Sequence, residues 1–169
     1  MLVSVFNCQK KFPICSKSVK ILLIFLCDYL KIATDHIDIR FVSDRKIRKD
    51  HEMIFNDPSP TDVISLPIDP PGSESFPSVL GELIVCPEFA FNYIKAKHLD
   101  SDNPYFFYRE LTLYIVHGLL HLIGYDDILV SDKQKMQRRQ RTIMLHLEKE
   151  MVLVKAPTKR RPPTSIQKE

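Results

Sequence analysis

The sequence predicts a single α+β domain in which a small mixed β-sheet of about four strands packs against helices. Four short apolar or alternating segments in the first half have strand patterns, while the second half carries longer helical patterns. Hydrophobic residues at 44% and charged residues at 27% are ordinary globular usage. A chain of 169 residues is the size of one domain.

Four segments are expected to form the strands. Residues 1–7 are short and apolar, and residues 36–44 alternate between apolar and polar side chains. Residues 61–68 have strand-like composition, and residues 79–86 are almost continuously apolar, as in an interior strand. Residues 67–77 hold several prolines and predict an exposed loop.

Helical patterns occupy most of the remaining chain. Apolar residues recur at i, i+3, i+4, i+7 and i+11 from Val19, and Ser16 or Ser18 can cap this helix. Ser131 and Gln134 form a capping-box pattern for a last helix that runs to about residue 152. The other helices are expected at residues 46–55, 87–99 and 104–123.

The basic charge is concentrated at the C-terminus. Residues 155–169 hold five basic residues and one acidic residue, so they carry +4 of a total net charge of +3 and leave −1 for the body. This segment is also rich in proline and poor in apolar residues. We therefore expect a functional domain at residues 1–152 and a basic, disordered tail at residues 153–169.

The cysteines and the N-terminal region indicate a cytoplasmic protein without a membrane segment. The four cysteines lack the spacing of a zinc knuckle, and in a chain this long they do not resemble a secreted disulfide framework. The apolar run at residues 21–27 is too short to span a bilayer, which takes about 20 residues. It also lacks a cleavage site typical of a signal peptide.

The segment HGLLHLIGYDD at residues 117–127 is the most informative. On a helix, His117 and His121 lie on one face about 6 Å apart, so both rings can converge on one ion. Gly124 can reverse the chain where the helix ends, which can bring Asp127 back over the pair. The pattern H-x-x-x-H-x-x-G-x-x-D therefore predicts three ligands and an open fourth position, as in a catalytic zinc site.

A histidine pair on an apolar helix is also compatible with ordinary histidines that bind no metal. However, two imidazoles in such a helix need polar partners, and a shared ion supplies them. Zinc peptidases of the H-E-x-x-H type carry a glutamate base directly after the first histidine, where this chain has Gly118. The sequence thus favours a metzincin-like zinc site on a long central helix and disfavours peptide hydrolysis.

HGLLHLIGYDD resembles the signature H-G-x-L-H-L-x-G-Y-D-H of the YbeY family of bacterial endoribonucleases. PTDVISLP at residues 60–67 and LGELIVC at residues 80–86 are similar to the family segments P-T-D-V-L-S-F-P and L-G-D-L-V-I-C. The resemblance covers roughly residues 1–150 and implies a single-strand-specific endoribonuclease that uses one Zn²⁺ held in a cleft. It also implies a cytoplasmic role in 16S rRNA 3′-end maturation and ribosome quality control, with ribosomal or small-subunit RNA as the partner.

Two positions depart from the family pattern. Asp127 stands where the family has a third histidine ligand, so the ion would carry a formal +1 and acidify water less. Asp126 is an alternative ligand one residue earlier. Many family members carry an arginine five residues before the P-T-D block, at the position of Phe55, which cannot hold a phosphate.

Several further residues are candidates for RNA contacts. Ser65 could contact a phosphate or bond to backbone, and basic residues of the last helix could face solvent or RNA. No general base can be assigned from the sequence, and Glu110 is a candidate acceptor behind the ligands. A peptidase-like zinc hydrolase and a non-catalytic ribosome-associated RNA-binding protein with a structural metal remain alternatives. In the tail, the candidates are Lys159, Arg160 and Arg161.

Overall fold

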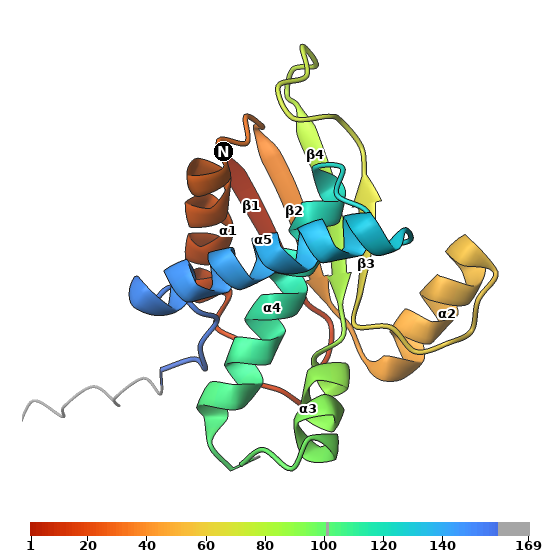
Figure 1. Cartoon of the computed structure of the whole chain (residues 1–169), viewed down its shortest axis with the longest axis vertical. Helices are drawn as coiled ribbons and strands as arrows, with labels where there is room; N and C mark the ends of the chain where they lie inside the picture. Colours follow the sequence, from red (N-terminus) through yellow and green to blue (C-terminus); the bar gives the residue numbers. More distant parts are fainter. Residues whose placement is uncertain (101, 159–169) are drawn as a thin grey trace, which may run out of the picture.

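A four-stranded mixed sheet forms the centre of the fold (Figure 1). The computed structural model describes residues 1–100 and 102–158. Strands β1, β2 and β4 are parallel, and β3 is antiparallel to β4, so the order across the sheet is β1-β2-β4-β3. The strands are β1 (Leu2–Asn7), β2 (His36–Phe41), β3 (Val63–Pro67) and β4 (Val79–Val85).

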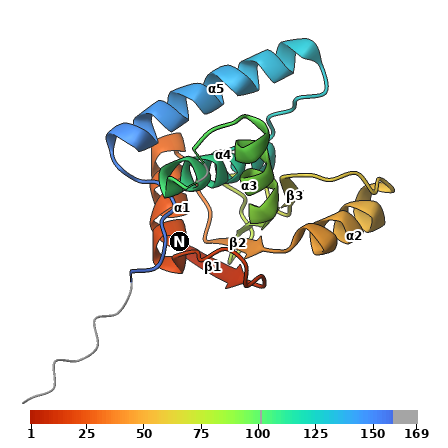
Figure 2. The same cartoon turned by 90° about the horizontal axis from the view of Figure 1, so that it is seen from below.

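Helices α1 and α4 cover one face of this sheet, and α5 lies across the outer side of α4 (Figures 1 and 2). This α+β arrangement with a mixed sheet of four strands confirms the fold class predicted from the sequence. The helices of the described chain are α1 (Ser16–Leu30), α2 (Asp44–Phe55), α3 (Pro87–Ala96), α4 (Pro104–Leu122) and α5 (Val130–Lys149).

The main core lies between the sheet and these helices. The inward side chains of the strands, including Ile37, Ile39 and Leu83, are fully buried against α1 and α4. A smaller core on the opposite face lies beside α2 and includes Ile47 and Ile84. Burial of this apolar area supplies the main stabilisation of the fold.

On this opposite face β2 carries polar side chains, which explains its alternating pattern. The hydroxyl of Ser4 lies 2.9 Å from His36 Nε2, which also lies 2.8 Å from Asp38 Oδ1. Arg40 pairs with Glu82 of the neighbouring strand at 2.9 Å. These side chains need polar partners because they stand on a half-covered sheet.

The helix caps differ from those expected. The N-cap of α1 is Cys15, and Ser18 instead donates to the Cys15 carbonyl at 2.8 Å. The last helix begins at Val130 with Leu129 at the N-cap, so Ser131 already lies inside the first turn and the capping-box prediction is wrong. A tertiary contact holds the start of α1, where Cys15 N donates to the Lys155 carbonyl, whereas the residues at the start of α5 are exposed.

The chain continues past α5 along the start of α1. Val154 is buried, and its N–H donates to the Thr112 hydroxyl at 3.0 Å. The backbone carbonyl of Lys155 accepts from Cys15 N–H at 2.9 Å, and its backbone N–H donates to Ser18 Oγ at 3.0 Å. The predicted tail boundary at residue 153 stays a prediction, because residues 159–169 lie outside the described residues.

Within the described chain, the helices are too short or too polar to cross a membrane.

Candidate metal centre

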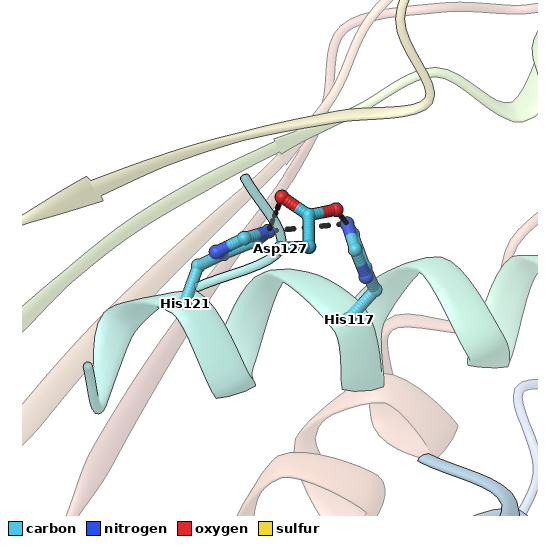
Figure 3. Close-up of side chains that lie close together, drawn as sticks. All are labelled: His117, His121 and Asp127. Carbon is cyan, nitrogen blue, oxygen red and sulfur yellow. Dashed lines mark hydrogen bonds and ion pairs between the residues drawn. The ribbon is translucent and has the colours of Figure 1, made fainter. Parts of the chain in front are cut away.

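The two histidines of α4 face a common point in front of the helix (Figure 3). Their spacing of four residues places His117 and His121 one turn apart. The Nε2 atoms are 3.2 Å apart, and the rings are nearly perpendicular at 87°. Both rings therefore present one nitrogen to the same space.

The end of α4 folds back and brings the third residue to this point. Gly124 has a φ of 91°, its N–H donates to the His121 carbonyl at 3.0 Å, and Tyr125 N–H donates to the Leu120 carbonyl at 3.0 Å. These two bonds are the Schellman arrangement, which requires a left-handed residue such as glycine. The local sequence at the end of α4 thus reverses the chain toward the histidines.

Asp127 lies over the histidine pair with both carboxylate oxygens turned toward it (Figure 3). Its Oδ2 is 3.9 Å from His117 Nε2, and its Oδ1 is 3.9 Å from His121 Nε2. One ligand atom from each residue lies within 4.8 Å of the other two, so the group could hold a metal ion. Within residues 1–100 and 102–158, it is the one such group of histidine, cysteine or acidic residues.

Asp126, the alternative ligand, has a different position. Its Oδ1 accepts from the backbone N–H of Asp127 at 2.6 Å and of Ile128 at 3.1 Å. The side chain is exposed and supports the turn that carries Asp127. The structure therefore brings Asp127, and not Asp126, together with the histidines.

A backbone carbonyl orients the second histidine. His121 Nδ1 lies 2.9 Å from the carbonyl oxygen of Tyr125. Because a carbonyl only accepts, this contact requires the proton on Nδ1 and leaves the lone pair of Nε2 free for an ion. Sequence reasoning missed this contact, because a backbone acceptor carries no residue-type signal.

The donor set fits a zinc ion. Two nitrogens bound to one tetrahedral zinc at ~2.0–2.1 Å lie about 3.3–3.4 Å apart, close to the 3.2 Å observed here. The carboxylate at 3.9 Å would have to approach by about half an ångström. The three side chains are 21–40% exposed, so the side of the group that faces solvent can admit water or a substrate.

Gly118 packs directly against the sheet. A Cβ at this position would lie 2.8 Å from Leu83 Cδ2 and 2.9 Å from Val63 Cγ2. Ser65 of β3 donates to the Gly118 carbonyl at 3.1 Å, so its hydroxyl bonds to backbone beside the histidines. The close approach leaves no space for the glutamate that a peptidase would need at residue 118.

The hydrogen bonds of His117 and His121 among the described residues do not involve Glu110. Its carboxyl group lies close to the Tyr114 hydroxyl and near the carboxylate of Asp62. Burial raises the pKa of Glu110, and burial together with the nearby Glu110 charge raises the pKa of Tyr114. We call these three residues the acidic cluster, and none of them belongs to the metal group.

The structure does not link the other candidates to the centre. Phe55, at the family's arginine position, ends α2 with its ring 5.2 Å from that of His51. Lys159, Arg160 and Arg161 lie outside the described residues, so their predicted RNA contacts stay predictions.

A family model described as Endoribonuclease YbeY matches residues 6–148. The chain is 40% identical over 152 residues to an Endoribonuclease YbeY of Chlamydia felis, covering 90% of this chain and 94% of the relative. It is 38% identical over 154 residues to the Endoribonuclease YbeY of Chlamydia pneumoniae, covering 91% and 96%. The solution structure of the Thermotoga maritima protein TM1509 shares the fold, with a TM-score of 0.58 at 22% identity over 89% and 91% of the two chains.

Proposed function

The chain belongs to the Endoribonuclease YbeY family, and we propose that it cleaves single-stranded RNA with one zinc ion held by His117, His121 and Asp127. The family supports the RNA endonuclease role, and the convergence of the three ligand atoms supports the metal dependence. We further propose a cytoplasmic role in 16S rRNA 3′-end maturation and ribosome quality control. Its partner would be RNA of the ribosome or of its small subunit.

Each residue of the candidate metal centre would have a distinct role. His117 and His121 would supply two nitrogens, and the Tyr125 carbonyl would keep His121 in the tautomer that can bind. Asp127 would supply an oxygen and one negative charge. When bound, the ion would polarise a phosphate oxygen and acidify a nearby water.

The carboxylate ligand would lower the net charge of the metal site relative to a site with three histidines. Two neutral imidazoles and one carboxylate would leave the bound ion with a formal charge of +1, where three imidazoles would leave +2. Water at such an ion is less acidic, so we expect cleavage to need a higher pH than with a three-histidine site. Around the centre, Ser65 and the tail residues Lys159, Arg160 and Arg161 are proposed to contact the RNA backbone.

The decisive experiment compares RNA and peptide cleavage by the purified chain. Single-stranded RNA, the same sequence as a duplex, and a peptide pool are incubated with the protein before chelation, after chelation and after zinc is restored. We expect cleavage of the single strand alone, loss with the chelator and recovery with zinc. His117→Ala should abolish cleavage, whereas His98→Asn, which removes an exposed imidazole outside the group, should not.

Two outcomes would contradict the proposal. Cleavage of peptides without cleavage of RNA would favour the peptidase-like hydrolase. Tight RNA binding without cleavage, together with unfolding on chelation, would favour an RNA-binding protein with a structural metal.

A further inference from the structure

A groove runs from the candidate metal centre along the line where α4 meets α5. One hollow of about 230 Å³ holds His117 and Asp127 in its wall. A second, of about 530 Å³, continues toward α3, and the two share Gln137 and Gln140. We call this the α4–α5 groove and define it by Tyr93, Arg109, Lys133, Gln137, Gln140 and Arg141.

One wall of the groove is the same stripe of α4 that carries the first histidine. Arg109, Leu113 and His117 follow one another at intervals of four residues, so they lie on one side of the helix. Eight residues correspond to about 12 Å along the helix axis. A strand that follows this wall from the centre would therefore run beside α4 for about 12 Å.

The groove has the charge that suits a nucleic acid backbone. Lys133 and Arg141 are exposed, and neither forms an ion pair with any part of the chain that the structure describes. Arg109 also lines the groove, but its charge is paired with that of Glu148. Among the described residues that line the two hollows, Asp127 is the single carboxylate, and it belongs to the centre itself.

The remaining lining suits bases and sugars. Gln137 and Gln140 carry amides that can both donate and accept hydrogen bonds. Tyr93 is 40% exposed at the far end, where its ring can stack on an unpaired base.

We propose that the α4–α5 groove binds the single-stranded segment of RNA that adjoins the cleavage site. Lys133 and Arg141 contact phosphates of this segment, and Tyr93 stacks on one of its bases. This inference rests on the proposed ribonuclease function and adds the path of the substrate to it.

The test measures binding to a fluorescent single-stranded RNA by anisotropy, with chelator present so that the RNA stays intact. Lys133→Ala combined with Arg141→Ala should weaken binding and lower the slope of log K against log salt by about 1.4, at ~0.7 per lost phosphate contact. Arg138→Ala is the matched control, because Arg138 is an exposed arginine of α5 that lines a different hollow. It should leave the slope unchanged.

The aromatic contact is tested separately. Tyr93→Ala should weaken binding by roughly 5- to 150-fold, the range expected for one stacked base, whereas Tyr93→Phe keeps the ring and should bind as the native chain does. Circular dichroism of each variant checks that the fold is intact.

The outcomes separate this inference from the function on which it rests. If the native chain cleaves single-stranded RNA but the groove variants bind it as Arg138→Ala does, the groove is refuted and the ribonuclease function stands. If the native chain neither binds nor cleaves single-stranded RNA, both proposals fail.

Discussion

The close contact between α4 and the sheet at Gly118 makes a quantitative prediction for Gly118→Ala. The added methyl would lie 2.8 Å from Leu83 Cδ2, 2.9 Å from Val63 Cγ2 and 3.1 Å from Ser65 Oγ. Two of these distances are shorter than real Cβ contacts, so side chains of the sheet must move. Overpacking of this kind costs about 1–3 kcal/mol.

Helix propensity acts in the opposite direction. Alanine in a helix interior is favoured over glycine by about 1 kcal/mol. Gly118→Ala is therefore expected to lower the free energy of unfolding by between about 0 and 2 kcal/mol. We expect a value near the middle, about 1 kcal/mol, because the two closest atoms are the ends of side chains that can shift partway. In a domain of this size that loss lowers Tm by about 2–4 °C.

Urea unfolding followed by circular dichroism measures this difference. If the tight contact is the cause, Gly118→Ala should destabilise the protein less in a Leu83→Val background, because valine lacks the Cδ2 atom that the methyl would meet. A variant that is more stable than the native chain by the full ~1 kcal/mol of helix propensity would falsify the tight contact. Equal losses in both backgrounds would show that Leu83 is not the obstacle.

Three further predictions concern the ligand, the acidic cluster and the tail. Asp127→Ala should lower the zinc content measured by elemental analysis, while Asp126→Asn, which keeps the turn acceptor, should not; equal contents would place the third ligand elsewhere. Since burial raises the pKa of Glu110 above 4.5, its ionisation costs folding free energy. Glu110→Gln should therefore gain stability relative to the native chain as pH rises from 4 to 7, and a constant difference in urea melts would contradict this. Removal of residues 159–169 takes away four basic residues and leaves the docked Lys155 in place. It should flatten the salt dependence of RNA binding by about 3 units of slope, and an unchanged slope would exclude a role for these charges.

Short-range features of the fold follow from the sequence. The periodic apolar pattern from Val19 predicts α1, and the alternation after His36 predicts β2. The helix ends are less well predicted: α2 begins at Asp44, two residues before the expected start, with Ser43 as its cap. Helix ends depend on contacts with other segments, and a propensity pattern does not contain them.

At the candidate site, the sequence predicts the neighbour of His117 but not the neighbours of Glu110. The partner of His117 is four residues away on the same helix, so the sequence pattern is enough to place the two rings together. The sequence makes Glu110, on the same face of α4, one candidate acceptor for them. It turns instead to Tyr114 and to Asp62, a residue next to β3, and a helical pattern carries no information about this neighbour.

The sequence by itself determined the histidine pair and the glycine turn that returns Asp127, because each depends on backbone geometry within eleven residues. Only the tertiary structure decided that residue 118 must lack a side chain and that α5 forms a groove beside the centre. Both depend on the distance between elements that are far apart in the chain. That distance is set by the packing of the whole core, which the sequence of one segment does not determine.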